Sequence, residues 1–382
     1  MAEMTSRERV TAALNHIEPD RVPLDIGGGQ SSSMVAEAYE NFLTHQGKPA
    51  GETRYLSYTF RVARLDEGTL LKLGSDVRPV LLKAPKNWTP PPSEPETFID
   101  ELGIKWKKAY NSTGYYWEQA TYPLAEATIA DLDAYPWPDP NDPGRYEGLE
   151  QEIKQLYYHT PYALMGDCGY KNHWEPAFLL LGLERALTAL AAEPDFIIAL
   201  MEKISALACG VTKRFLEITG PYLTVVRTSD DVATQKSLMM SPATYRKLIK
   251  PYHKRYFSLI KQYTEAKIFY HSCGNVVGLL DELIDAGVEV LNPVQVAAFK
   301  DPAKVKADFG DRLSFWGGID TQYVLPCGTP AQVQDEVRLR IQQFGPGGGF
   351  VAAPVHNIQG DVPPENVLAF SEAIQRYGKY PH

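Results

Sequence analysis

The chain repeats one pattern over most of its 382 residues: a short apolar run, then a longer stretch with helical spacing of apolar residues. We read eight such runs as strands, at residues 21–29, 76–82, 163–166, 223–226, 268–270, 290–292, 314–317 and 350–353. Continuously apolar runs are typical of parallel strands that helices cover. Eight strand–helix units predict an α/β fold of the (β/α)8 barrel (TIM barrel) type.

Helices are expected before, between and after these strands. An opening helix begins with the capping-box sequence Thr5-Ser6-Arg7-Glu8. Further helices are expected at 34–44, 60–73, 174–187, 194–218, 241–264, 276–286, 301–309, 330–344 and 364–377. An open, doubly wound sheet is the alternative architecture, but no G-x-G-x-x-G fingerprint follows the first strand.

Residues 84–145 interrupt the pattern after the second strand. They contain Pro90-Pro91-Pro92, a hairpin pattern at 103–108 and 115–119, and a proline-punctuated connection at 135–140. Their apolar residues are too few for a core of their own. We therefore expect an insertion into a single domain that spans residues 1–382.

Charge and composition exclude several classes of protein. The net charge of −9 argues against nucleic-acid binding. No apolar run is long enough to span a membrane, and nothing resembles a targeting signal. Four cysteines in a chain of this length do not suggest a disulfide framework and fit a reducing compartment. We expect a cytoplasmic monomer or homodimer.

Polar side chains follow nearly every predicted strand, at the end where a barrel places its active site. They are Asp25, Asp167, Cys168, Arg227, Asp230, Asp231, His271, Cys273, Asn292, Gln295, Asp320, His356 and Asn357. Of the neighbouring Asp230 and Asp231, one is expected to face the site and the other to cap the following turn. Such paired carboxylates are candidates for general acid/base work or for orienting metal ligands.

The pair His271-x-Cys273 directly follows a predicted strand. In an extended segment residues i and i+2 point to the same face, so the imidazole and the thiol converge and form half of a zinc site. The alternative is a buried cysteine beside a hydrogen-bonded histidine. Among the other thiols, Cys209 is predicted to lie in the core and Cys327 to be structural, while Cys168 either lines the site or is buried.

The C-terminal segment Gly348-Gly349-Phe350-Val351-Ala352-Ala353-Pro354-Val355-His356-Asn357-Ile358-Gln359 resembles the signature of the uroporphyrinogen decarboxylase superfamily. Supporting matches are Arg7-Glu8-Arg9-Val10, Asp20-Arg21-Val22-Pro23, Leu73-Gly74-Ser75-Asp76, Ser229-Asp230-Asp231 and Trp316-Gly317-Gly318-Ile319-Asp320. The resemblance covers most of the chain outside the insertion. It implies a (β/α)8 barrel, in agreement with the strand count.

One branch that the resemblance implies is the decarboxylases, which act on uroporphyrinogen without a cofactor. They use arginines near the N-terminus, an aspartate and a histidine of the signature, whose place His356 takes here. In this reading His356 would work with Asp76 or Asp231. However, the first strand runs into the segment 27–33, which has no arginine to pair with the carboxylates of a porphyrinogen.

The other branch resembles zinc methyltransferases that move a methyl group from a corrinoid protein to a thiol such as coenzyme M. Their zinc is held by an H-x-C pair, matched by His271 and Cys273, and by a later cysteine, where this chain has His356. A His2Cys set is an acceptable zinc shell, and its fourth position would be open to substrate. The chain has no D-x-H-x-x-G corrinoid-binding segment, so a corrinoid such as methylcobalamin would arrive on a partner protein.

The resemblance therefore predicts a zinc-dependent, corrinoid-linked methyltransferase that acts on a small molecule. The expected zinc ligands are His271, Cys273 and His356, and the expected catalytic residues are Asp230, Asp231 and His356. Substrate contacts are expected from Asp25, Asp76, Asp167, Arg227, Asn292 and Gln295. A third alternative is a non-catalytic module that binds a corrinoid or tetrapyrrole in a tyrosine-rich pocket.

Overall fold

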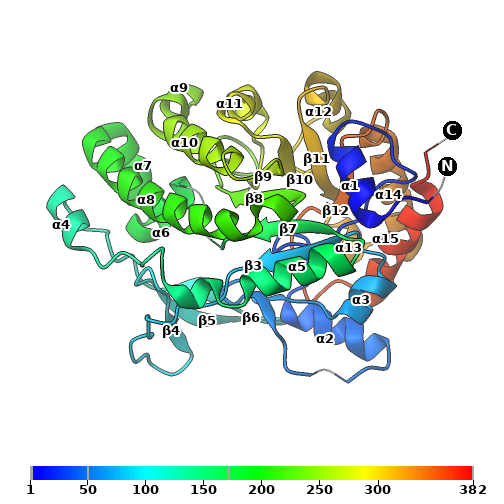
Figure 1. Cartoon of the computed structure of the whole chain (residues 1–382), viewed down its shortest axis with the longest axis horizontal. Coiled ribbons are helices and arrows are strands. Elements are labelled where there is room, and N and C mark those ends of the chain that lie inside the picture. The colour runs from blue at the N-terminus through cyan, green and yellow to red at the C-terminus, as the bar shows by residue number, and fades with distance from the viewer. Residues whose placement is uncertain (1–2, 50, 170–172, 381–382) are drawn as a thin grey trace.

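The computed structural model describes residues 3–49, 51–169 and 173–380, and its centre is a sheet of seven parallel strands (Figure 1). In spatial order they are β12 (Phe350–Pro354), β11 (Ser314–Ile319), β10 (Val290–Val294), β9 (Lys267–His271), β8 (Val225–Ser229), β7 (Ala163–Asp167) and β3 (Val77–Leu81). Every neighbouring pair is parallel. The predicted α/β, TIM-barrel-like architecture is confirmed at this level.

The segment 21–29 does not form the eighth strand that its apolar run predicts. Leu24 makes a single parallel bridge to Ala352. The amide of Asp25 nevertheless donates to Ala352 O (2.9 Å) and the amide of Asp76 donates to Leu24 O (2.8 Å), so this segment contacts both edges of the sheet. Pro23 has no N–H to donate, and Gly27 turns the chain with a φ of 93°, which together keep the extended stretch short.

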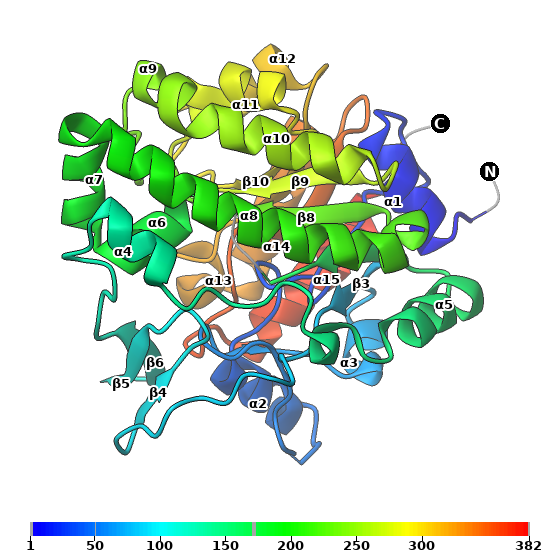
Figure 2. The same cartoon turned by 60° about the vertical axis from the view of Figure 1, so that its left-hand side comes forward.

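Helices surround the sheet, and Figure 2 shows α8 and α10 in front of strands β8 to β10. The helices near the termini are α1 (Ser6–Leu14), α2 (Ala36–His45), α3 (Glu67–Lys72), α14 (Pro330–Phe344) and α15 (Pro364–Tyr377). Between them lie α5 (Leu149–His159), α6 (Trp174–Leu181), α7 (Leu183–Ala192), α8 (Pro194–Thr219), α9 (Pro242–Thr244), α10 (Lys250–Lys261), α11 (Leu280–Ala286), α12 (Pro302–Phe309) and α13 (Val324–Cys327). None of the helices in the described residues has the length and apolarity that a membrane-spanning helix needs.

Two predicted helices are wrong in extent, for local reasons. The helix expected at 174–187 is two helices, α6 and α7, because Gly182 between them has a φ of 85°. The helix expected at 60–73 is reduced to α3, whose first turn is capped by the Asp66 side chain accepting from Thr69 N.

The interior of the sheet is packed by large side chains that the strands point inward. Val77, Met165, Phe269 and Trp316 belong to this cluster, together with Val10 of α1. Helix α1 lies at the amino ends of the strands, since Arg7 N donates to Pro161 O just before β7. The amino end of the sheet is thus closed by α1, and the carboxyl end is left for a site.

Residues 84–145 contain a second, antiparallel sheet that lies apart from the central strands (Figures 1 and 2). Its strands, in order, are β4 (Thr97–Ile99), β5 (Lys105–Asn111) and β6 (Gly114–Gln119), and α4 (Ile129–Ala134) follows. The hairpin expected from 103–108 and 115–119 is therefore present. Phe98 packs edge-on against Trp117 at a centroid distance of 4.7 Å, which gives this sheet a small aromatic core. A further short pair, β1 (Tyr55–Ser57) and β2 (Val62–Ala63), precedes it.

Candidate metal centre

His271, Cys273 and His356 come together at the carboxyl end of the sheet. His271 is the last residue of β9, Cys273 lies two residues further, and His356 follows β12. One ligand atom from each of the three side chains lies within 4.8 Å of the other two. Cys273 Sγ is 3.4 Å from His271 Nε2, and the two imidazole centroids are 5.6 Å apart. The structure thus brings together the three side chains that the sequence proposed as metal ligands.

Asn292, in the middle of the neighbouring strand β10 and paired with His271, fixes the tautomer of that histidine. Its Nδ2 donates to Trp316 O (2.9 Å), which identifies Oδ1 as the acceptor for His271 Nδ1 at 2.5 Å. Nδ1 therefore bears the imidazole hydrogen, and the lone pair of Nε2 faces the cluster. A hydrogen bond of this kind on the distal nitrogen is how proteins orient metal-ligating histidines. Asn292 contacts a candidate ligand instead of the cavity.

Two side chains hold the loop that contains Cys273. Asp231 Oδ1 accepts from Cys273 N (2.8 Å), and Gln295 Oε1 accepts from Gly274 N (2.7 Å). Gly274 has a φ of 89°, and a Cβ there would lie 2.4 Å from Thr234 O, so the tight turn requires glycine. Gln295 acts on the loop in this structure and does not line the cavity.

The side chains of Asp230 and Asp231 point to different places. The sequence predicted such a division, with one aspartate facing the site and the other capping a turn. The Asp230 carboxylate is fully buried and accepts from Trp174 N (2.9 Å) and Glu175 N (2.5 Å) at the start of α6. It also accepts from His253 Nε2 at 2.7 Å. Burial disfavours its charge, but these hydrogen bonds hold the pKa of Asp230 below its ordinary value. Asp230 anchors α6, whereas Asp231 lines the cavity.

Arg227, in the middle of β8, and Asp167, the last residue of β7, form a mostly buried ion pair. Arg227 Nη1 is 3.1 Å from Asp167 Oδ2, and its Nη2 donates to Ser31 Oγ at 2.9 Å. Gln30 Nε2 donates to the same Asp167 oxygen (3.0 Å). Arg227, Gln30 and Ser31 line the cavity. Asp167 is not part of the lining and accepts hydrogen bonds from Arg227 and Gln30.

Asp25 and Asp76, both expected to contact substrate, lie away from the cavity. Asp25 accepts from Trp316 Nε1 (2.9 Å) inside the sheet, and burial raises its pKa to about 6. Asp76 precedes β3 and is therefore at the amino end, opposite to the His–Cys–His cluster. It is paired there with Arg9 (2.7 Å) and Arg21 (2.8 Å).

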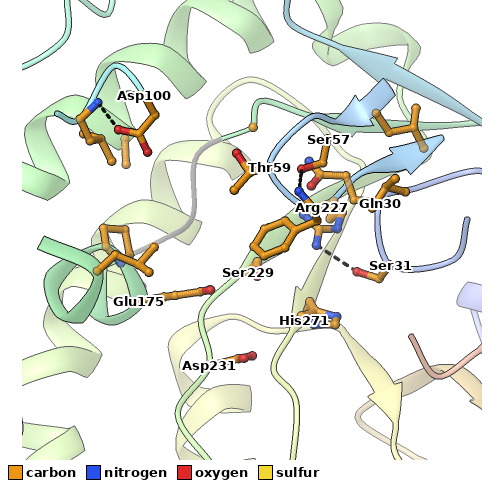
Figure 3. A pocket seen from close by; sticks show the side chains of 18 of the residues that line it. Gln30, Ser31, Ser57, Thr59, Asp100, Glu175, Arg227, Ser229, Asp231 and His271 are labelled. Atoms are coloured by element: carbon orange, nitrogen blue, oxygen red, sulfur yellow. Dashed lines mark hydrogen bonds between the residues drawn. The ribbon is translucent and has the colours of Figure 1, made fainter. Parts of the chain in front are cut away.

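A cavity of about 390 Å³ opens beside the cluster (Figure 3). Its polar end contains Gln30, Ser31, Arg227, Ser229, Asp231, His271, His356 and Asn357. Its remaining wall is mainly apolar and comes from β1, β2, residues 84–145, α6 and α8: Leu56, Phe60, Val62, Leu102, Trp106, Trp137, Pro176, Leu179, Leu180, Ile204, Leu207 and Ala208. Asp100 lies at the end remote from His271 in this view.

Several cavity residues were not predicted from the sequence. Glu175 lines the cavity from the first turn of α6. It would have been proposed if the candidate residues had included the start of the helix that follows each strand. Asp100 and Glu101 come from residues 84–145, where no strand-end rule applies. Gln30 and Ser31 follow the three glycines at 27–29. These glycines predicted a loop but did not indicate that the next residues would line a cavity.

The other three thiols lie outside the cluster. Cys168 is buried with its Sγ 3.2 Å from Thr212 Oγ1. Cys209 lies on α8 near Ser205, and Cys327 is exposed at the end of α13. The predicted core position of Cys209 holds in part, because this side chain is half-buried against the core.

The donor set of the cluster fits zinc. Thiolate and imidazole are the usual zinc ligands, with bonds of about 2.3 and 2.0 Å. Two such bonds at a tetrahedral angle separate sulfur and nitrogen by roughly 3.5 Å, close to the 3.4 Å between Cys273 Sγ and His271 Nε2. The hydrogen bond from His271 Nδ1 to Asn292 Oδ1 is the outer hydrogen bond that metal-ligating histidines commonly have, and it leaves Nε2 facing the cluster.

The family-model comparison and the curated relatives point to one family. Residues 125–377 match the family model described as uroporphyrinogen decarboxylase (URO-D). The uroporphyrinogen decarboxylase of Aeromonas salmonicida is 26% identical over 285 residues, covering 70% of this chain and 75% of that protein. That of Escherichia coli O157:H7 is 23% identical over 284 residues, with the same coverage. A methyltransferase from Methanosarcina mazei has a TM-score of 0.67 at 18% identity, covering 98% of this chain and 99% of its own, which shows a shared fold.

Proposed function

This chain belongs to the uroporphyrinogen decarboxylase family, and we propose that it is a zinc-dependent methyltransferase within it. The observation that supports this most directly is the His271–Cys273–His356 cluster, whose ligand atoms lie within 4.8 Å of one another. In the proposal these three side chains hold one zinc ion, with a fourth position open toward the cavity. A bound zinc would lower the pKa of a substrate thiol and keep it as thiolate.

The charges around the cavity argue against a porphyrinogen as substrate. Among the residues that the structure describes, four carboxylates line it, from Asp100, Glu101, Glu175 and Asp231, against one guanidinium, from Arg227. Arg227 is already paired with Asp167. A substrate with many carboxylates needs several cations to replace its lost hydration. The lining therefore favours methyl transfer over decarboxylation.

The protein side chains have distinct roles in this proposal. Asn292 positions His271, and Asp231 positions the Cys273 loop through the 2.8 Å hydrogen bond to its amide. Arg227 orients the polar end of the substrate, with Ser31 and Asp167 holding the guanidinium in place. Asp230 acts only by anchoring α6. We therefore propose Asp231 as the aspartate that faces the substrate in the cavity.

The methyl donor in the proposal is a methyl-corrinoid carried by a partner protein. The methyl-corrinoid would supply the methyl group without its bonding electrons and would keep that electron pair. A new carbon–sulfur bond forms at the acceptor thiolate, and the thiol proton passes to solvent. The apolar wall of the cavity would keep water from the thiolate during transfer.

Metal analysis of the purified protein tests the zinc site. Wild type should contain about one zinc per chain, and the double variant Cys273→Ala with His356→Ala should contain almost none. Cys327→Ala is the matched control, because this exposed thiol lies outside the cluster, and its zinc content should equal that of wild type. Full zinc occupancy in the double variant would overturn the assignment.

The role of Asn292 can be measured separately. Asn292→Leu removes the acceptor for His271 Nδ1 while keeping a similar volume, so zinc affinity should fall about 10- to 100-fold. Competition with a chromogenic chelator gives that affinity. An unchanged affinity would show that Asn292 does not position the ligand.

The reaction is tested with methylcobalamin and a small thiol, followed by the visible spectrum of the cobalamin. Loss of the methylcobalamin spectrum should require the protein and stop on treatment with a chelator. Turnover of uroporphyrinogen by chelator-treated protein would instead identify a metal-free decarboxylase. Cobalamin binding without either reaction would identify a binding module.

A further inference from the structure

A short turn at residues 57–60 forms part of the cavity wall. It joins β1 (Tyr55–Ser57) to β2 (Val62–Ala63), and Ser57 and Thr59 line the cavity (Figure 3). A pair of strands this short has little stability of its own in water. Contacts from other parts of the chain must therefore hold the turn against the cavity.

Backbone hydrogen bonds connect this turn to the segment that contains a candidate metal ligand. Ala63 N, on β2, donates to Met34 O at 2.8 Å. Met34 is bridged in turn to Ile358, which lies two residues after His356. The turn and the His–Cys–His cluster are thus connected through one hydrogen-bonded assembly.

The buried side chain of Arg61 holds the end of the turn. Its Nη1 donates to the Glu37 carboxylate on α2 and to Tyr115 O on β6 (2.7 Å). The guanidinium carbon is 3.6 Å from the centroid of the Tyr115 ring, which is a cation–π contact. One side chain therefore joins the turn to a helix of the main domain and to the small antiparallel sheet.

The backbone of Arg61 has a conformation that an arginine rarely adopts. Its φ is 53°, in the left-handed region, where a Cβ is unfavourable and glycine is tolerated. Arg61 N donates to Tyr58 O at 3.0 Å and so closes the turn. Such conformations persist where surrounding contacts enforce them, and they are frequent at ligand-binding sites. The contacts of the Arg61 side chain with Glu37 and Tyr115 enforce it here.

From these contacts we infer that Arg61 is a positioning residue, which holds the turn 57–60 where Ser57 and Thr59 contact the methyl acceptor. Arg61 is not among the described residues that line the cavity, so it acts on the acceptor through the turn. This inference rests on the proposed methyl transfer, because that reaction brings the acceptor into the cavity. The position of the turn can be measured without the reaction.

Steady-state kinetics with methylcobalamin and 2-mercaptoethanol test this role. Arg61→Ala should raise the KM for the thiol about tenfold, with kcat within about twofold of wild type and zinc content unchanged. Arg64→Ala is the matched control, because Arg64 pairs with Glu152 (3.0 Å) and is not one of the described lining residues. Its KM should equal that of wild type. An unchanged KM in Arg61→Ala would overturn the inference.

Arg61→Gly distinguishes displacement of the turn from a general loss of packing. Both variants lose the guanidinium contacts, but glycine adopts a φ of 53° without strain. The turn should therefore stay closer to its original position, and the KM of Arg61→Gly should lie between those of wild type and Arg61→Ala. A KM for Arg61→Gly that equals or exceeds that of Arg61→Ala would contradict the positioning role.

Proteolysis with chymotrypsin separates failure of this inference from failure of the proposed function. Tyr58 is 53% exposed within the turn, and cleavage after it requires local opening. Cleavage there should be several-fold faster in Arg61→Ala than in wild type or Arg64→Ala. If no thiol is methylated but this cleavage is faster, methyl transfer is wrong and the placement of the turn by Arg61 stands. If thiols are methylated and either the KM or the cleavage rate is unchanged, the inference is wrong and methyl transfer stands.

Discussion

Asp25 is a carboxylate enclosed by the inward-facing side chains of the sheet. It is only 1% exposed, and although Trp316 Nε1 and Gly28 N donate to it, burial raises its pKa from 3.8 to about 6. A carboxyl whose pKa is higher in the folded state binds its proton more tightly there, so its stabilising contribution is lost as the pH rises. That loss occurs between about pH 4 and pH 6, from the two pKa values.

Asp25→Asn removes this titration and gives a pH-dependent prediction. The free energy of unfolding of wild type, minus that of the variant, should decrease by about 2 kcal/mol between about pH 4.5 and pH 7. Urea denaturation at several pH values measures the difference, and contributions of all other groups cancel. A difference that stays constant over this range would mean that the pKa of Asp25 is not raised.

At the residue scale, the sequence predicted some positions and not others for a geometric reason. His271, Cys273 and His356 follow strands, and the carboxyl ends of parallel strands meet at one edge, so their convergence could be predicted. Asp76 also lies beside a strand, but it precedes β3 and is at the opposite end. Choosing polar residues that are adjacent to a predicted strand does not separate those at its carboxyl end from those at its amino end. That separation requires strand limits that are correct to one residue.

Helix α6 is the element that brings Glu175 to the cavity, and Asp230 anchors it. The carboxylate accepts from the amides of Trp174 and Glu175 and from His253 Nε2. Tyr245 OH lies 2.9 Å from the other nitrogen of that imidazole, so the anchor extends into the η3 segment Tyr245–Ile249. The start of α6 thus depends on one buried acceptor.

Asp230→Asn should loosen α6 selectively. An amide offers one acceptor oxygen in place of two, so buried donors lose partners, at a cost of about 3 kcal/mol. Hydrogen exchange should increase at residues 174–181 more than in α15. Asp231→Asn, whose side chain lines the cavity, is the matched control and should leave exchange in α6 unchanged. Equal exchange in both variants would contradict the anchoring role.

At the element scale, the spacing of apolar residues predicted that a helix exists more accurately than it predicted where the helix begins and ends. Helices α14 and α15 have the predicted limits, 330–344 and 364–377, where prolines mark the starts. The stretch 174–187 keeps an apolar pattern across Gly182, so periodicity alone could not locate the break. Asp230, which anchors the start of α6, is distant from this helix in the sequence. The local pattern of apolar residues therefore carries no information about this contact.

In the molecule as a whole, a network of buried ion pairs and the His–Cys–His cluster lie at opposite ends of the central sheet. At the amino end of the strands, Arg9 pairs with Asp20 (2.6 Å) and Asp76 (2.7 Å), and Arg21 pairs with Asp76 (2.8 Å). Asp76 also accepts from Ser6 Oγ of α1 and from Leu24 N. This network joins α1, the segment 21–26 and β3, at the opposite end from the His–Cys–His cluster.

Asp76→Asn should therefore reduce stability without changing the metal centre. Removing one charge leaves two mostly buried guanidinium groups with fewer partners, so the free energy of unfolding should fall by about 3 kcal/mol. Zinc content of the folded variant should equal that of wild type. A stable variant that has lost its zinc would show that the two ends are coupled. The sequence could not distinguish this role from substrate binding, because both need a buried carboxylate beside a strand.

Residues 84–145 lie outside the central sheet yet contribute Asp100, Glu101, Leu102, Trp106 and Trp137 to the cavity wall. The candidate metal ligands come instead from the ends of β9 and β12, and the family match begins only at residue 125. The part of the cavity wall that residues 84–145 supply and the candidate metal ligands are thus encoded by different stretches of the chain. Relatives could diversify in one while preserving the other, and exchanging this region between them is a direct route to new specificities on an unchanged centre.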